Sequence, residues 1–282
     1  MKKTIFAILL IFPLSIFAQK PDTRELLESM LKSVNEVKGI KYNFKYYERV
    51  KKGTRIGENE IKISEDPFKA YIYVKEPQKG AEVLYLSEDN SDNVTVKPDG
   101  FPYMTLSISM HNPAFRQDQH HTITHAGLRY FGGIIEDAMR RADELNRFDE
   151  LFKLKGSITW EGRECWVLIA DYEDFDLLNY TVKKGETITS ISNKLKVNDY
   201  MVLSYNPNIK DFSSVKEGQV IKVPDGYAKK TILYIDKEYN IPIMQTMFDK
   251  EGMFQKYEYR NVVINPKYAP DEFTKKYKDY KF

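Results

Sequence analysis

The chain has 282 residues, of which 42% are hydrophobic and 30% are charged, and its formal net charge is +2. This composition is ordinary for a globular protein, and the length allows one large and one small domain. A nucleic-acid binder is usually far more basic, so we expect no nucleic-acid partner. The aromatic fraction of 13% leans on tyrosine and favours a β-rich fold.

Residues 1–18 have the pattern of a secretory signal peptide. Two lysines near the start precede the apolar run 5–17, which is too short to span a bilayer. Ala18 supplies a small residue at the cleavage position, and no cysteine follows that could carry a lipid anchor. We therefore expect a cleaved signal and a periplasmic protein, with an extracellular location or a retained N-terminal anchor as alternatives.

The first part of the mature chain is predicted to form one helix followed by a series of strands. Residues 22–38 have apolar side chains on one helical face, and Gly39 suits the end of that helix. Alternating side chains and intervening turn residues predict strands at 40–50, 57–64, 68–75, 81–87, 94–97 and 103–108. This succession indicates an antiparallel sheet.

The segment 109–125 lacks a clear period and contains all four histidines of the chain: His111, His120, His121 and His125. Histidine is a common metal ligand, but this spacing does not fit the two-turn HExxH helix. We expect no metal site, no cofactor and no catalytic residue here. Thr124 is predicted to cap the next helix, with His121 bonded to the backbone at its start.

That second helix is predicted to place Leu128, Phe131, Ile134, Ile135, Ala138 and Met139 on its inward face. Strands are predicted to follow at 152–160 and 164–172. The single cysteine, Cys165, lies in the second of these strands, so the chain has no internal disulfide. We interpret it as a small buried hydrophobe rather than a nucleophile.

Residues 180–224 are predicted to form strand, helix, helix and strand in succession. Thr187 and Asn198 are N-cap candidates for the two helices, and Pro207 ends the second helix. The motifs lie at 180–182, 184–188, 206–209 and 216–224. In type and order they resemble those of a LysM domain, although Glu186 stands where that family more often has Asp.

The resemblance implies binding of N-acetylglucosamine polymers such as peptidoglycan in a shallow groove between two loops. The first loop contributes Gly185, Glu186, Thr187 and Ile188, and the second contributes Asn206, Pro207, Asn208 and Ile209. A packing module that has lost sugar binding is the alternative.

The ends of such a unit lie close together, so it can be inserted into a host loop. We therefore predict a host domain in two parts, 19–178 and 227–282, interrupted by a LysM domain at 179–226. Strands at 230–236, 241–248 and 253–263 would complete the host, and the segment from Pro270 is predicted to be a short helix or a tail.

The host resembles LolA-like periplasmic carriers in the strand 231–236, the Ile241-Pro242 turn, the hairpin 249–252 and the segments 257–261 and 272–273. The middle, with Arg116, His121 and Gly127, resembles a related secreted family of unknown function. The fold class implied is α+β: a half-closed antiparallel β-barrel with a helical lid, plus the inserted βααβ unit.

Three interpretations of the host remain open. The first is a non-catalytic binder of a lipid, a lipoprotein acyl chain or another hydrophobic ligand, because half-closed sheets can hold one small ligand. Its cavity candidates are Phe44, Leu128, Phe131, Ile135 and Ala138. The second is a wall-bound structural scaffold whose interior is packed core. The third is a metal-dependent enzyme that uses the histidine segment.

Overall fold

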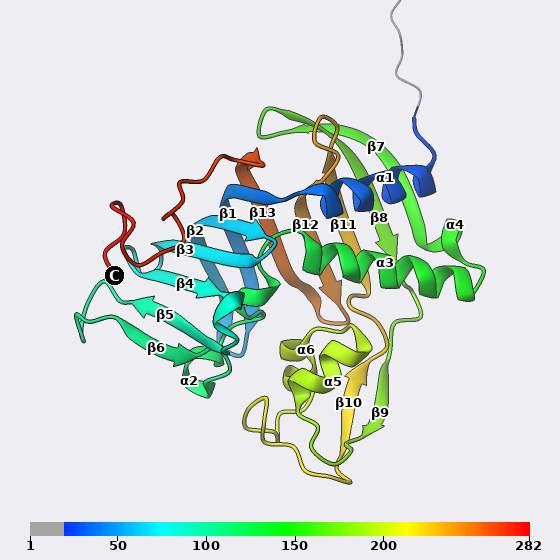
Figure 1. The fold of residues 1–282 in the computed structure, drawn as a ribbon. Coiled ribbons are helices and arrows are strands. Elements are labelled where there is room, and N and C mark those ends of the chain that lie inside the picture. Colours follow the sequence, from blue (N-terminus) through cyan, green and yellow to red (C-terminus); the bar gives the residue numbers. More distant parts are fainter. Residues whose placement is uncertain (1–19) are drawn as a thin grey trace, which may run out of the picture.

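The computed structural model describes residues 20–282, and its main element is one antiparallel sheet of eleven strands (Figure 1). Across the sheet the strands are β6 (Leu106–Ser109), β5 (Asn93–Lys97), β4 (Glu82–Leu86), β3 (Phe68–Glu76), β2 (Gly53–Glu65), β1 (Gly39–Val50), β13 (Gly252–Ile264), β12 (Pro242–Asp249), β11 (Lys230–Asp236), β8 (Arg163–Asp171) and β7 (Phe152–Trp160). Within the described residues, no ladder joins β6 to β7. The sheet is therefore open, as predicted. The residues of the predicted signal peptide, 1–18, lie outside the part of the chain that the structure describes.

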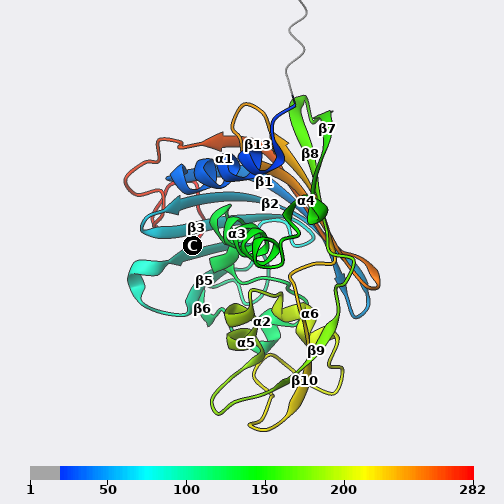
Figure 2. The same ribbon diagram turned by 90° about the vertical axis from the view of Figure 1, so that its right-hand side faces the viewer.

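The two long helices lie on the same side of this sheet (Figure 2). Helix α1 (Thr23–Glu36) begins at Asp22, whose side chain accepts hydrogen bonds from the amides of Arg24 and Glu25. Helix α3 (Arg129–Glu144) packs beside it. The helical lid predicted from the sequence is thus present.

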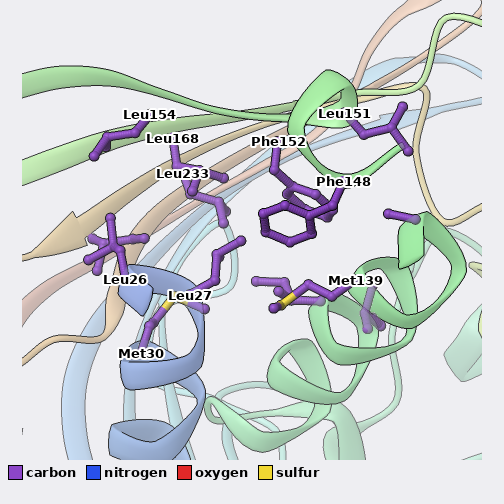
Figure 3. Packing of buried hydrophobic residues seen from close by; sticks show 14 of the residues in the cluster. Leu26, Leu27, Met30, Met139, Phe148, Leu151, Phe152, Leu154, Leu168 and Leu233 are labelled. Atoms are coloured by element: carbon purple, nitrogen blue, oxygen red, sulfur yellow. The ribbon is translucent and has the colours of Figure 1, made fainter. Parts of the chain in front are cut away.

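The core under the lid is made of aliphatic and aromatic side chains from both layers. Leu26, Leu27 and Met30 of α1 meet Met139 of α3, and both helices cover the sheet at Leu168 and Leu233 (Figure 3). The short helix α4 (Phe148–Leu151) closes one end of this cluster. Fully burying one such side chain contributes about 1.5–3 kcal/mol, so this cluster is a main source of host stability.

The start of α3 differs from the prediction. Thr124 lies in the 3₁₀ turn η2 (Ile123–His125), and its hydroxyl bonds the hydroxyl of Thr122 rather than a helix amide. Gly127 has a φ of +88°, a conformation that ends the turn and that side chains rarely adopt. The helix therefore begins only at Arg129, and the Thr124 cap prediction is wrong.

The opposite face of the sheet is covered at β3 and β4 by the C-terminal segment 265–282. Tyr71 stacks on Tyr280 with ring centroids 3.7 Å apart, and Phe273 joins the same cluster. The sheet is therefore covered on both faces at this place. The segment forms successive turns rather than a helix, so the tail alternative is the one observed.

The inserted unit forms its own two-stranded sheet and two helices, in the predicted order. Its elements are β9 (Leu177–Thr181), α5 (Ile188–Leu195), α6 (Asp199–Ser204) and β10 (Val220–Pro224). Thr187 and Asn198 are the N-caps of α5 and α6, as the sequence predicts. The host strands on either side, β8 and β11, pair directly, with Asp171 opposite Lys230. The sheet thus continues uninterrupted across the insertion.

A buried ion pair joins the insert to the host. Arg116, at the end of the short helix α2 (Pro113–Arg116), places a terminal guanidinium nitrogen 2.7 Å from a carboxylate oxygen of Asp199. The two side chains are only 2% and 5% exposed. The guanidinium also lies over the Phe212 ring and donates to the Gln119 carbonyl oxygen.

The next contact to the insert is made by His120, which is fully buried. Its ring is stacked between Tyr200 of α6 and Phe254 of β13, with centroid distances of 4.5 and 4.3 Å. Its Nε2 lies 2.9 Å from the Arg49 carbonyl oxygen, which can only accept. The segment 113–120 therefore connects the host sheet to the insert through packing as well as charge.

We predict that Arg116→Met destabilises the whole chain, because it leaves the Asp199 carboxylate buried without its counter-charge. Removing one partner of a buried pair costs about 3–5 kcal/mol. Chemical denaturation measures this loss. Arg140→Met is the control, since Arg140 pairs with Asp137 and Glu144 on the exposed face of α3 and should leave the unfolding midpoint in place. Equal midpoints for both variants would contradict the importance of the buried pair.

Candidate ligand-binding sites

The two loops predicted to bind glycan lie at the surface of the insert, but only some of their side chains are accessible. Gly185, Pro207 and Asn208 are exposed. Gly185 has a φ of +78°, which suits glycine and turns the chain from β9 towards α5. The loops are linked through the backbone, since the Ile188 amide donates to the Phe212 carbonyl oxygen at 2.9 Å.

Three of the predicted residues hold the loops in shape. Glu186 accepts from the Tyr180 hydroxyl and the Lys183 amide, and these bonds hold the pKa of its carboxyl below the usual range, with the Lys183 amide bond the largest cause. Thr187 caps α5 in a reciprocal pair with Ser190.

Asn206 fixes the second loop. Its amide nitrogen donates to the carbonyl oxygens of Val202 and Lys222, and its side-chain oxygen accepts from the Lys222 amide at 2.9 Å. Ile188 and Ile209, by contrast, are 0% and 4% exposed and belong to the core of the insert. Of the eight predicted residues, three are therefore exposed, two are buried, and Glu186, Thr187 and Asn206 are half-buried.

A cavity of about 250 Å³ lies between the sheet and the segment 115–131. We call it the tyrosine cavity, because the following tyrosines contribute to its wall: Tyr42, Tyr46, Tyr130, Tyr227, Tyr257 and Tyr259. Phe44, predicted as a cavity residue, lines it, and so does Phe131. His121 and His125 also line this cavity.

A second cavity, of about 280 Å³, runs beside α3 from Phe131 to Leu145, and we call it the aliphatic cavity. Its wall includes Phe131, Ile135 and Ala138, three of the predicted cavity residues. Phe131 and Tyr227 line both cavities and so stand between them. Leu128, the remaining predicted residue, is fully buried in the host core and lines neither cavity.

The insert forms part of the aliphatic cavity. Lys196 and the linker residues Asp225 and Gly226 contribute to its wall. Arg141 of α3 donates to the carbonyl oxygens of Leu195 and Asp225, at 2.6 and 2.8 Å. This arginine connects the lid helix to the end of α5 and to the linker that follows the insert.

The four histidines occupy three different environments. His111 is exposed, and His120 is locked in the interface described above. His121 and His125 place their Nδ1 atoms 3.2 Å apart, and His121 Nε2 lies 3.3 Å from the Tyr227 hydroxyl. The predicted bond from His121 to the helix backbone is therefore replaced by side-chain bonds. Among residues 20–282, no group of three or more His, Cys, Asp or Glu is arranged to hold a metal.

Both cavity histidines are held neutral by their surroundings. Burial lowers the pKa of His125 to about 3, and Arg116 and His111 add to the effect. Burial, followed by the nearby His125, lowers the pKa of His121 well below its usual range. Cys165 is equally enclosed in β8, where burial raises the pKa of its thiol to about 11. A thiol with such a pKa is a poor nucleophile at neutral pH.

Sequence reasoning missed the polar residues of the tyrosine cavity. Gln245 takes an inward position in β12, where Ile243 and Met247 flank it on the same face. An amide at a predicted core position is a signal that could have identified it. Tyr227 lies in the linker after the insert and carries no such periodic signal.

Two family models match parts of this sequence. Residues 37–175 match a model described as a protein of unknown function (DUF1571), in the region where the sequence resembles a family of unknown function. Residues 180–224 match the LysM domain. The chain therefore combines the predicted half-open antiparallel sheet with an inserted LysM domain. A search of curated proteins gives no match.

Several solved structures are similar to this chain at low identity. Lipoprotein LppX from Mycobacterium tuberculosis has a TM-score of 0.41 at 8% identity, covering 88% of this chain and 99% of its own. LprF from Mycobacterium bovis has a TM-score of 0.41 at 10% identity, covering 90% and 98%. A LolA superfamily protein from Nitrosomonas europaea has a TM-score of 0.35 at 8% identity, covering 92% and 100%. None of the helices within residues 20–282 is long and apolar enough to cross a membrane.

We predict that acid weakens the fold through His121 and His125. Their pKa values are lower in the folded chain than the value of about 6.5 in an unfolded chain, so below that pH the unfolded state binds protons that the folded state does not. Stability is therefore complete above about pH 6.5 and falls as the pH drops below it, by about 2 kcal/mol at pH 5 for His125, whose pKa in the folded chain is about 3. His121 acts in the same direction. Denaturation at pH 7.5 and pH 5 measures the difference.

The variant His125→Phe keeps a ring against Tyr130, on which His125 stacks at 3.8 Å, and should reduce this pH dependence. His111→Asn, in the exposed part of the same segment, removes only the smallest of the three influences on the His125 pKa and should retain most of the pH dependence. A loss of stability between pH 7.5 and pH 5 that is the same in wild type and His125→Phe would refute the assignment.

Proposed function

We propose that the chain is an exported, non-catalytic envelope protein that binds N-acetylglucosamine polymers, chiefly peptidoglycan, and holds a hydrophobic ligand in its host domain. The observation that carries the proposal is the LysM match over 180–224, on a complete βααβ unit whose loop tips are exposed. The division into 19–178, 179–226 and 227–282 is part of this proposal.

The arrangement of the insert supports glycan binding. Its contacts with the host include Asp199 and Tyr200 at the start of α6, Leu195 at the end of α5 and Tyr205, whose hydroxyl donates to Asp249 of β12. Pro207 and Asn208, beyond the end of α6, stay exposed, as does Gly185. Glu186 and Asn206 hold the two loops in place before any ligand arrives, which lowers the entropy cost of binding.

The aliphatic cavity supports the second half of the proposal. A scaffold would fill this space with side chains, because protein interiors are normally close-packed. Here Ala138, a small residue, faces a cavity of about 280 Å³ whose wall includes Ile135 and Leu233. Each methylene of a ligand chain buried there contributes about 0.8 kcal/mol, so a short acyl chain would bind usefully.

We expect the exported protein to sediment with purified peptidoglycan sacculi. The double variant Lys184→Trp with Asn208→Trp should lower the bound fraction at least about tenfold, because it places bulk beside Gly185 in one loop and at the tip of the other. Glu136→Trp, which adds the same side chain on exposed α3, should bind as wild type does. Binding that persists in the double variant would argue against these loops, and no binding by wild type would leave the insert as a packing module.

We expect the protein to bind the uncharged fluorophore N-phenyl-1-naphthylamine saturably. Ala138→Trp fills the aliphatic cavity and should weaken this binding at least about tenfold, whereas Glu136→Trp on the exposed side of the same helix should not. Circular dichroism checks that both variants stay folded. A folded wild-type protein that takes up no fluorophore would eliminate the ligand-binding half and favour the structural scaffold.

A further inference from the structure

The tyrosine cavity contains an amide that the protein itself does not satisfy. Gln245 is 0% exposed and lines this cavity. Neither its Nε2 nor its Oε1 has a hydrogen-bond partner among the described residues. The Tyr259 hydroxyl is a polar neighbour of this amide: burial raises the pKa of Tyr259, and the Gln245 amide partly opposes that rise. No hydrogen bond within 3.5 Å joins the two side chains, and the hydroxyl donates instead to the Gly127 carbonyl oxygen at 3.5 Å. A buried amide without partners raises the free energy of the folded protein. A ligand group that hydrogen-bonds this amide removes that penalty, so its bond contributes more to affinity than a surface hydrogen bond that only replaces one to water.

A second polar atom at the cavity wall is also unsatisfied. The side-chain oxygen of Asn59, on β2, is buried and has no partner among residues 20–282. By contrast, the nearby amide of Gln255 is fully engaged, with the Tyr227 hydroxyl on its nitrogen and His120 on its oxygen. Buried polar atoms without partners among the described residues also occur outside the cavity, at Arg49, Glu65, Ser192 and Arg260, but the two side-chain amides in this state both line the tyrosine cavity.

The charged groups around the cavity are already neutralised. Glu48 accepts from the Tyr257 hydroxyl at 2.8 Å and pairs with Arg55 at 3.3 Å. Arg55 also donates to the Asp118 carbonyl oxygen. A charged ligand would lose its hydration here without gaining a free counter-ion, which is a large penalty. An uncharged hydrogen-bonding group avoids that penalty.

From this arrangement we infer that the tyrosine cavity is a second, selective binding site. It takes an uncharged compound with an apolar body against the aromatic wall and one amide, carbonyl or hydroxyl group on Gln245. Phe44 and Tyr257, 5.2 Å apart between ring centroids, form part of the surface for the apolar body. This site does not depend on a ligand in the aliphatic cavity or on the LysM domain.

A matched series of eight-carbon ligands tests the inference. Octanamide and 1-octanol are uncharged, octanoate is an anion and octylammonium is a cation at pH 7.5. Calorimetric titration uses the Ala138→Trp protein, in which the aliphatic cavity is filled, so that binding reports on the tyrosine cavity. We expect octanamide and 1-octanol to bind at least about fivefold more tightly than either ion.

Gln245→Leu tests the amide directly. It should weaken octanamide at least about fivefold while leaving the unfolding midpoint unchanged or raised, because a buried amide without partners is removed. Thr246→Val is the control on the opposite face of the same strand and should leave the octanamide affinity as it was.

Equal affinity for octanoate and octanamide would overturn the inference, as would an unchanged octanamide affinity in folded Gln245→Leu protein. Failure of all four compounds to bind would also overturn it. None of these results touches the uptake of N-phenyl-1-naphthylamine by wild type or its loss in Ala138→Trp, so the two hypotheses fail separately.

Discussion

The buried pair of Arg116 and Asp199 is the contact on which the arrangement of the two domains depends. It joins α2 of the host to α6 of the insert in a place where neither charge reaches solvent. After Arg116 the chain reaches His120, which is stacked between the insert and the sheet. His121 and His125, which line the tyrosine cavity, come next. One segment thus holds the insert and encloses the tyrosine cavity, and displacing it would affect both.

The open sheet explains why two cavities remain beside α3. The core-facing side of an open sheet must be covered by other elements, and α1 and α3 together cover only part of it. Where α1 and α3 meet, the core is continuous, and Gly132 lets Val34 approach closely. At the start of α3 only Phe131 and Tyr227 stand between the two cavities, so the empty volume is divided rather than merged.

The order of elements was predictable because each one has a local signal. The period of α1, the caps at Thr187 and Asn198 and the alternation in the strands all reflect contacts within a few residues. The later start of α3 could not be read this way, because it depends on Gly127 fitting against Glu65 and Ile63, which come from another part of the chain. Coverage of Tyr71 by Tyr280 likewise joins distant segments.

The candidate sites follow the same division. Motif residues of the LysM loops were identified from the sequence, but the burial of Ile188 and Ile209 depends on packing between α5, α6 and the following loop. Phe131, Ile135 and Ala138 line a cavity because a helical period brought them to one face. Tertiary structure alone gives Arg116 its partner Asp199 and leaves Gln245 without one, so the sequence offers no direct sign of their roles.

The double connection of the insert has a geometric consequence. A domain at the end of a single flexible linker can swivel freely, but this one leaves and re-enters the host through paired neighbouring strands and is also held at α6. A glycan strand on its loops would therefore keep a fixed angle to the host sheet. If the proposed glycan binding holds, the direction of the bound strand would set the direction in which the two cavities face.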